Sequence, residues 1–257
     1  MKFNFFKYQA TGNDFILIDN RSGGTALSKD QIAQLCDRRF GVGADGVILI
    51  GQDPSADFSV DYYNSDGSQS LCGNGSRAAV VFASYLGITN GRARFNAYDG
   101  IHEAELGGDG TVRLKMNDVT RCDRVDGDFL INTGSPHYIR FVDDVETLDV
   151  VEEGRAIRNS DRFREKGVNV NFVELRQGNT IFVRTYERGV EDETLSCGTG
   201  VTAAALAASF QGLRSSVTVL TRGGTLKVEF KTGQSGMFHD IFLIGPAKMV
   251  FEGNLEL

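Results

Sequence analysis

The chain has 257 residues, a length that suits one large domain or two smaller ones. Its formal net charge is −7, and no basic cluster is present to neutralise phosphates, so a nucleic-acid or anionic-membrane surface is not expected. No apolar run approaches the roughly 20 residues of a membrane span, and the N-terminus is too polar for a signal peptide. We therefore expect a cytoplasmic protein with a small-molecule partner and no contact with nucleic acid or membrane.

Turn and strand patterns predict many strands and few helices. The first half is predicted to contain strands at 2–8, 15–19, 46–50 and 57–64, a helix near 28–38, a loop and helix after Cys72, and strands within 92–116. From about residue 118 the second half is predicted to contain strands within 128–142, a helix near 146–158, strands at 168–175 and 180–186, a loop and helix after Cys197, and closing strands. The acidic run at 191–193 is interpreted as a solvated loop.

The two cysteine segments form an internal repeat. The segment CGNGSRAAVVFASYLG begins at Cys72, and CGTGVTAAALAASFQG begins 125 positions later at Cys197. Eight of the 16 aligned positions are identical, which indicates two related halves. We predict an α+β fold of two pseudo-symmetric domains, 1–117 and 118–257, with about the last ten residues as candidates to cross back to the first. Each domain is predicted to wrap a mostly antiparallel sheet around a central helix, with the active site in the cleft between the domains.

Each repeated cysteine is predicted to stand at a helix N-terminus, because a glycine loop precedes an Ala-rich run. The free N–H groups and the positive end of the helix dipole stabilise anions there, so a thiol ionises more readily and a carboxylate is held. Cys36 and Cys122 lie in no glycine loop and are interpreted as buried structural residues. The four cysteines show neither CxxC nor Cys/His metal spacing, so free thiols and no metal site are expected.

One glycine motif needs a separate interpretation. GVGADG at 41–46 matches the dinucleotide fingerprint, but it follows charged residues and precedes a predicted strand, whereas the fingerprint requires a helix there. We interpret it as a glycine turn. Because no phosphate loop or convincing Schiff-base lysine is evident, no cofactor is expected.

Two equivalent thiols suit one kind of reaction in particular. Inversion of a carbon stereocentre by proton transfer needs a base on one face and an acid on the other, and a thiolate with a thiol meets that need. The helix N–H donors would also bind a substrate carboxylate, which takes up negative charge as the α-carbanion forms. The repeat therefore indicates a cofactor-independent epimerase or racemase.

Several motifs resemble those of the diaminopimelate epimerases. They are TGNDF at 11–15, YNSDGSQSLCGNGSR at 63–77, VNVNF at 168–172 and YERGVEDETLSCGTG at 186–200. The two cysteine loops alone indicate only the broader superfamily, which includes proline racemases and phenazine-biosynthesis isomerases. The resemblance implies interconversion of LL- and meso-diaminopimelate, on the route to lysine and peptidoglycan precursors, by a homodimer.

The same resemblance implies roles for individual residues. Cys72 and Cys197 are the implied acid/base pair, and His137 and Glu187 are implied to bias the two thiols so that one is ionised. The residues implied to hold the reacting end of the substrate are Asn13, Gly73, Asn74, Gly198 and Thr199. Those implied to bind its distal end are Asn64, Asn169 and Arg188, and Glu187 is implied to contact the substrate as well. Ser135 stands where the family often has Asn, and it is a weaker binding candidate because a hydroxyl has a shorter reach.

Other interpretations stay open at this point. Asn13 and Asn64 lie among turn-forming residues, His137 follows a proline, and Glu187 with Arg188 fits an exposed ion pair. As alternative functions we consider a racemase for a smaller substrate such as proline or hydroxyproline, a thiol redox protein, and a non-catalytic amino-acid binding module. Arg188 separates the first from the leading hypothesis, because a substrate with one carboxylate gives it nothing to hold.

Overall fold

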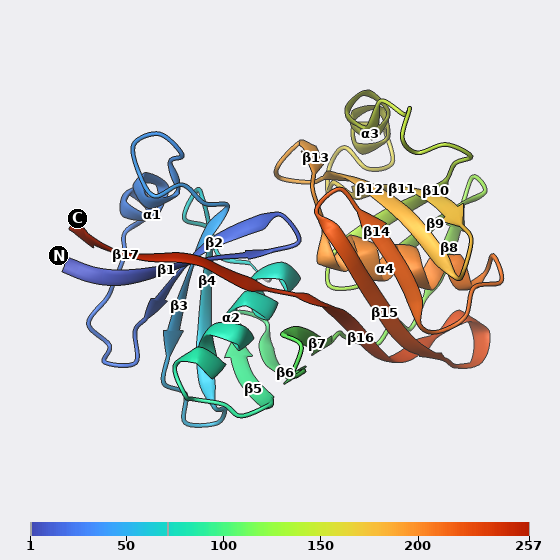
Figure 1. Ribbon diagram of the computed structural model, residues 1–257. Helices are drawn as coiled ribbons and strands as arrows, with labels where there is room; N and C mark the ends of the chain where they lie inside the picture. The colour runs from blue at the N-terminus through green and yellow to red at the C-terminus, as the bar shows by residue number, and fades with distance from the viewer. Residues whose placement is uncertain (1, 71, 257) are drawn as a thin grey trace. The chain divides into compact units, whose positions relative to one another are not determined.

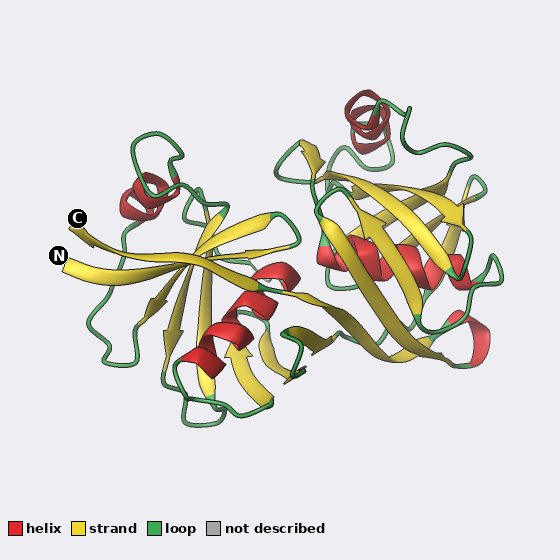
Figure 2. Ribbon diagram, in the orientation of Figure 1, coloured by secondary structure: helices red, strands yellow, loops and turns green. Residues whose placement is uncertain are grey.

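Figure 1 shows the computed structural model, which describes residues 2–70 and 72–256. The chain divides into two compact units. Unit 1 consists of Met1–Leu114 with Gly245–Leu257, and unit 2 of Lys115–Ile244. In both units strands predominate and one long helix lies against them (Figure 2). Among the described residues, none of the helices combines the length and the apolar character that crossing a membrane requires.

Unit 1 is a mixed sheet with two helices. Its elements are β1 (Lys2–Ala10), β2 (Asn13–Asp19), α1 (Lys29–Cys36), β3 (Gly46–Gly51), β4 (Phe58–Asn64), α2 (Gly73–Tyr85), β5 (Arg92–Ala97), β6 (Gly100–Leu106), β7 (Thr111–Lys115) and β17 (Lys248–Glu256). The strand pairs β17–β1, β1–β2, β3–β4, β5–β6 and β6–β7 are antiparallel. The pairs β2–β3 and β4–β5 are parallel.

Helix α2 is the core element of unit 1. Ten of its 13 residues are buried, and most of these are small, so the helix can approach the strands β1 to β4 closely. Phe82 packs its ring against Phe6 and Tyr8, with centroid distances of 4.8 and 5.7 Å. Full burial of such a side chain contributes about 1.5–3 kcal/mol to stability. This packing holds α2 against the strands, and Cys72 is the N-cap residue of the same helix.

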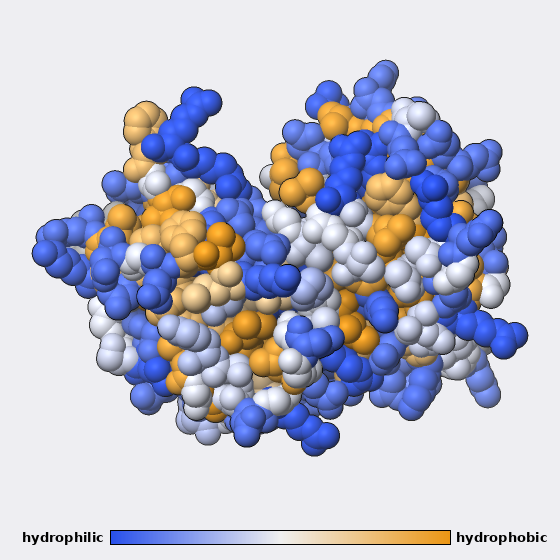
Figure 3. All heavy atoms as spheres, viewed as in Figure 1, coloured by the Kyte–Doolittle hydropathy of each residue, from blue (hydrophilic) through white to orange (hydrophobic). Residues whose placement is uncertain are grey.

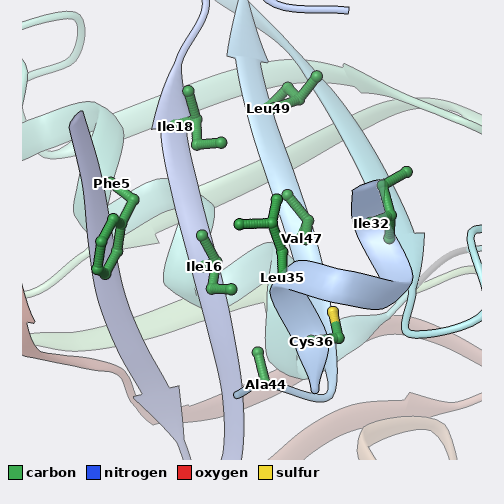
Figure 4. Close-up of a cluster of buried hydrophobic side chains, with 9 residues drawn as sticks. All are labelled: Phe5, Ile16, Ile18, Ile32, Leu35, Cys36, Ala44, Val47 and Leu49. Carbon is green, nitrogen blue, oxygen red and sulfur yellow. The ribbon is translucent and has the colours of Figure 1, made fainter. Parts of the chain in front are cut away.

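Helix α1 covers a second apolar cluster. A capping box starts it, in which Ser28 Oγ accepts from the Gln31 backbone N–H and the Gln31 side chain accepts from the Ser28 N–H. Ile32 and Leu35 then pack with Ile16 and Val47 of the sheet (Figure 4). The loop after α1 returns to the sheet at Asp45, directly before β3.

Unit 2 repeats this architecture. Its elements are β8 (Cys122–Val125), β9 (Asp128–Asn132), β10 (Pro136–Phe141), α3 (Val150–Arg158), β11 (Asn169–Arg176), β12 (Thr180–Glu187), β13 (Asp192–Thr194), α4 (Gly198–Ser209), β14 (Val217–Thr221), β15 (Gly224–Thr232), a 3₁₀ turn η1 (Gln234–Gly236) and β16 (Phe238–Pro246). The pairs β10–β11 and β12–β14 are parallel, and the other pairs are antiparallel. Ten of the 12 residues of α4 are buried.

The pairing order shows that the two units share one topology. The series β17-β1-β2-β3-β4-β5-β6-β7 has the same sequence of parallel and antiparallel pairs as β8-β9-β10-β11-β12-β14-β15-β16. Helix α2 follows β4 as α4 follows the β12–β13 hairpin, and α1 follows β2 as α3 follows β10. The C-terminal strand β17 thus fills in unit 1 the place that β8 takes in unit 2. The predicted α+β class, with two related halves of mostly antiparallel sheet around a central helix, is confirmed.

One local prediction is wrong. The acidic run at 191–193 was expected to be a solvated loop, but Asp192–Thr194 forms the short strand β13. The Glu193 side chain is 12% exposed and pairs with Arg184 at 2.7 Å and Arg222 at 3.0 Å. Arg184 also donates to the carbonyls of Val145 and Leu148. A carboxylate held between two guanidinium groups therefore anchors this hairpin.

Candidate active site

Cys72 is the N-cap residue of α2. Its backbone is extended, with φ −127° and ψ 111°, and its Sγ accepts from the Gly75 backbone N–H at 3.4 Å. Gly73 and Asn74 are the first two residues of the helix, so their N–H groups have no partner within it. This is the helix N-terminus that the sequence predicts. The Cys72 sulfur and the N–H groups at this helix N-terminus together form a site that attracts negative charge.

An amide acceptor faces the Cys72 thiol. Asn13, the first residue of β2, has its Oδ1 3.6 Å from Cys72 Sγ and 3.3 Å from Asn74 Nδ2. Asn13 Nδ2 donates to Asp45 Oδ2, and a carboxylate can only accept, so Oδ1 is the atom that faces the thiol. The structure therefore joins the predicted residues Asn13, Asn74 and Cys72 in one network in unit 1.

A buried arginine lies beneath the same turn. Arg77 is 0% exposed and donates to Gly73 O at 3.3 Å, Asn74 Oδ1 at 3.0 Å and Thr11 Oγ1 at 3.1 Å. Its Nε has no hydrogen-bond partner, and within the described ranges 2–70 and 72–256 no carboxylate pairs with it. Burial lowers the pKa of Arg77 to about 10, and the charge of Cys72 opposes that shift. The guanidinium thus stays charged at neutral pH.

The other charges near this site cancel each other. Lys7 pairs with Asp14 at 2.6 Å, and Arg38 pairs with Asp14 and Asp45 at 2.7 Å each. The cluster therefore holds two cations and two carboxylates. Both Lys7 and Arg38 help to hold the pKa of Asp14 at about 2, against the opposing effect of burial.

Asn64 lies at the end of β4, in its own turn. Its Nδ2 donates to Ser68 O, Ser68 Oγ and Ser70 Oγ at 3.0–3.2 Å. Turn formation, the alternative considered from the sequence, therefore accounts for these contacts. None of them joins Asn64 to the Cys72 network.

Cys197 is the N-cap residue of α4, with the same extended backbone as Cys72 (φ −115°, ψ 112°). Gly198 and Thr199 start the helix, and Thr199 Oγ1 lies 3.5 Å from Cys197 Sγ. Thr133 Oγ1 donates to Thr199 O at 2.8 Å, which ties the turn to the end of β9. The second cysteine is thus also at a helix N-terminus, as predicted.

Hydroxyl groups and a neutral histidine surround Thr199. His137 Nε2 lies 2.9 Å from both Ser135 Oγ and Thr199 Oγ1, and the two hydroxyl oxygens are 3.2 Å apart. Burial lowers the pKa of His137 to about 3, and the positive charge of Arg188 adds to the effect. At neutral pH His137 is therefore an uncharged hydrogen-bonding group.

Asn169 joins this cluster to the β12 hairpin. Its Nδ2 donates to Ser135 Oγ at 3.1 Å and Pro136 O at 3.3 Å, and its Oδ1 accepts from the Arg188 backbone N–H at 2.9 Å. The exposed Arg188 side chain donates to Lys166 O at 3.0 Å. Glu187, at the end of β12, accepts from Thr194 Oγ1 at 2.8 Å.

The remaining cysteines differ in burial: Cys36 is buried, as predicted, whereas Cys122 is only half-buried. All four cysteines are free thiols, as expected. Burial raises the pKa of both Cys36 and Cys122 to about 11, with Asp123 adding to the shift at Cys122. Both thiols therefore stay protonated and unreactive at neutral pH.

Among the polar residues that touch the predicted site residues, Asp45, Arg77 and Asn171 were not identified from the sequence. The sequence signal for Arg77 is a difference between the two repeats, because Thr202 occupies the position that aligns with Arg77. Asn171 was visible as the second asparagine of VNVNF, because residues two apart on a strand share a face. Asp45 had no local signal, since its contact with Asn13 spans 32 positions.

Comparison with known proteins now decides the family. The family model of diaminopimelate epimerase matches residues 5–122 and 129–250, nearly the whole chain. The chain belongs to the diaminopimelate epimerase family. It is 48% identical over 255 residues to a diaminopimelate epimerase of Flavobacterium psychrophilum, with 96% of this chain and 98% of that protein aligned. It is 43% identical to the diaminopimelate epimerase of Chlorobaculum tepidum, over 96% of this chain and 98% of that protein.

Solved structures share the fold of this diaminopimelate epimerase family member. A Bacillus anthracis phenazine biosynthesis protein of the PhzF family aligns with a TM-score of 0.79 at 14% identity, over 100% of both chains. A hydroxyproline epimerase from Agrobacterium vitis aligns with a TM-score of 0.71 at 15% identity, over 100% of this chain and 93% of that one. At these identities the likeness concerns the fold alone.

Proposed function

We propose that this protein interconverts LL- and meso-diaminopimelate, with Cys72 and Cys197 as the two acid/base groups at the α-carbon. The observation that carries the proposal is the matched pair of cysteines. Each is the N-cap residue of a buried helix, at the same place in a repeated topology, in a chain of the diaminopimelate epimerase family. Lysine biosynthesis is the pathway that this reaction serves.

In the proposed reaction, the thiolate of one cysteine removes the α-proton and the thiol of the other donates a proton to the opposite face. The C–H electron pair stays on the carbanion and then forms the new C–H bond, so each turnover exchanges the charge states of the thiols. The amides of Gly73, Asn74, Gly198 and Thr199 are proposed to hold the reacting end. Because these N–H donors are already in position before the reaction, they stabilise the negative charge that develops on the substrate carboxylate.

The distal end of the substrate is proposed to bind at Asn169 and Arg188, with Asn64, Glu187 and Ser135 as further contacts. The exposed Arg188 guanidinium has a fork of donors that suits a carboxylate. We expect Arg188→Ala to raise KM for diaminopimelate and to cost about 2–5 kcal/mol of transition-state binding. Arg164→Ala, which removes another exposed arginine, is the matched control and leaves KM unchanged. Unchanged kinetics in Arg188→Ala would refute the distal-site assignment.

The activity itself is tested by chromatographic separation of the diaminopimelate isomers after incubation of LL-diaminopimelate with reduced protein. The expected result is conversion to meso-diaminopimelate until both isomers are present at equilibrium. L-Proline and trans-4-hydroxy-L-proline serve as competing substrates. Turnover of either, with none of diaminopimelate, would replace the proposal by a racemase for smaller substrates. Binding without turnover would indicate an amino-acid binding module.

Cellular location and assembly are further parts of this proposal. We place the enzyme in the cytoplasm as a homodimer. Apolar side chains gather over β17 on the face drawn in Figure 3. Three apolar residues of this strand, Met249, Val250 and Phe251, are 44–58% exposed. An exposed apolar patch of this kind is typical of an interaction surface. Sedimentation equilibrium gives the mass directly, and a monomer at micromolar concentration would contradict the homodimer.

A further inference from the structure

The buried amide of Asn171 has a fixed orientation. Asn171 lies on β11 and is 0% exposed. Its Nδ2 is 3.2 Å from the backbone oxygen of Tyr138 and 3.1 Å from His137 Nδ1, and its Oδ1 accepts from Thr185 Oγ1 at 2.9 Å. A backbone carbonyl can only accept. The atom beside it must therefore be the amide nitrogen, which directs its second hydrogen at His137.

This orientation decides which nitrogen of His137 carries the proton. An amide N–H that points at Nδ1 requires a lone pair there, so the neutral ring must have its hydrogen on Nε2. An imidazolium would place two donors against each other. Burial independently keeps the ring uncharged, as it lowers the pKa of His137 to about 3.

The hydrogen bonds beyond His137 then have one direction. The single Nε2–H hydrogen of His137 is shared between the hydroxyl oxygens of Ser135 and Thr199, each 2.9 Å from Nε2. Asn169 Nδ2 donates to Ser135 as well. With its oxygen already accepting, Ser135 donates to Thr199 at 3.2 Å, and the Thr199 hydrogen is directed at Cys197 Sγ at 3.5 Å. Every donor in the chain thus faces toward the sulfur.

We propose that Asn171 is a positioning residue for epimerisation, which holds His137 as its Nε2–H tautomer so that the Ser135 and Thr199 hydroxyls donate toward Cys197. This inference rests on the proposed function of Cys197 as a proton acceptor and donor. A donated hydrogen bond stabilises the Cys197 thiolate formed when the α-proton is taken up. Asn171 is buried against His137, Tyr138 and Thr185, so it acts through His137.

Nitrogen-15 NMR of histidine-labelled, reduced, ligand-free protein tests the tautomer directly. The chain has three histidines, and His137→Gln assigns the signals of His137. We expect the coupling pattern of an Nε2–H ring that does not titrate across the neutral pH range. A ring protonated on Nδ1, or an imidazolium, would overturn the inference without any change at Asn171. Because no substrate is present, this result is independent of whether the protein epimerises diaminopimelate.

Two variants then separate positioning from packing. Asn171→Leu keeps the side-chain shape but removes the N–H donor, so we expect an Nδ1–H ring to become populated and kcat to fall roughly ten-fold with KM unchanged. Thr185→Val is the matched control, since it removes the bond at the other end of the same amide but leaves the Tyr138 carbonyl to orient it. Its ring tautomer and kcat should equal those of the wild type. An unchanged ring and kcat in Asn171→Leu, or equal loss of kcat in both variants, would overturn the inference.

Discussion

The two cysteine sites have the same backbone but opposite electrostatic surroundings. Cys72 faces the amide oxygen Asn13 Oδ1, an acceptor, above the buried charged Arg77. Cys197 faces the hydroxyl of Thr199 beside the neutral His137. At the position aligned with Arg77, Thr202 donates to Gly198 O at 2.9 Å, whereas Arg77 donates to the equivalent Gly73 O. Arg77 and Thr202 thus donate to equivalent carbonyl oxygens of the two helices, but only Arg77 brings a charge.

The difference shows how duplicated halves can serve a reaction that is itself asymmetric. The helix N-terminus is common to both sites and supports either a thiolate or a carboxylate. The side chains around it set how readily each thiol gives up or regains its proton. One site uses a buried cation and an amide acceptor, and the other uses hydroxyl groups beside a neutral histidine.

The largest effect should come from removal of either sulfur. Cys72→Ser and Cys197→Ser each leave a hydroxyl that is a far weaker acid, so kcat for epimerisation should fall roughly 10²–10⁴-fold in both variants. Steady-state assays with LL- and with meso-diaminopimelate measure it. Cys36→Ser and Cys122→Ser are the controls, and we expect near wild-type rates. A strong loss in only one of the two active-site variants would mean that one cysteine does both transfers.

The neutral histidine should make stability depend on pH. The pKa of His137 is lowered from 6.5 to about 3 in the folded protein, so below about pH 6.5 the unfolded state binds the proton that the folded state does not. The free energy of unfolding should therefore fall by up to about 1.4 kcal/mol per pH unit as the pH drops toward 3. Urea unfolding at a series of pH values measures the slope. His137→Gln should lose this component, and an identical slope in both proteins would contradict it.

The second glycine of each CGxG loop should differ in importance. A β-carbon at Gly200 would overlap Asn171 Oδ1, whereas one at Gly75 would lie 3.3 Å or more from its neighbours. Gly200→Ala should thus cost about 1–3 kcal/mol of the free energy of unfolding, and Gly75→Ala clearly less. Urea unfolding of the pair makes the comparison. Equal losses of unfolding free energy in the two variants would mean that the overlap with Asn171 Oδ1 adds no cost at Gly200.

The smallest expected effect concerns the buried cation. Arg77→Met removes the charge beneath Cys72, so the pH midpoint for alkylation of Cys72 should rise by roughly one unit or more. The measurement uses iodoacetamide and a Cys197→Ser background. Thr202→Val, at the aligned position, is made in a Cys72→Ser background and should move the midpoint of Cys197 less. Equal shifts would remove the distinction between the two sites.

Local sequence was sufficient for the features that depend on local structure. The repeat predicted both cysteines at helix N-termini, since glycine followed by Ala-rich residues is a local signal. It also predicted the order of most strands. The short strand β8 was not predicted, because four residues carry too little pattern. Glu193 was misread as solvated because its partner Arg222 is 29 positions away.

The surroundings of the sulfurs depend on contacts that sequence spacing does not show. The parallel register of β10 and β11 aligns His137 with Asn169, and this brings Asn171 against the ring. Asp45 reaches Asn13 because β2 and β3 are neighbours in the sheet. The roles of Asn64, Asn169 and Arg188 at the distal end, and of Glu187 beside the substrate, stay predictions.

The central claim is that two different groups, one per half of the chain, transfer the protons. Mass spectrometry and proton NMR of the diaminopimelate pool during the first turnovers in D₂O test it most directly. A thiol that donates a solvent-derived deuteron to one face, while the other thiolate takes the substrate proton, predicts deuterium at the α-carbon of the meso product and none in the remaining LL substrate. Deuterium in the recovered substrate at the same early times, or protium retained in the product, would contradict the account.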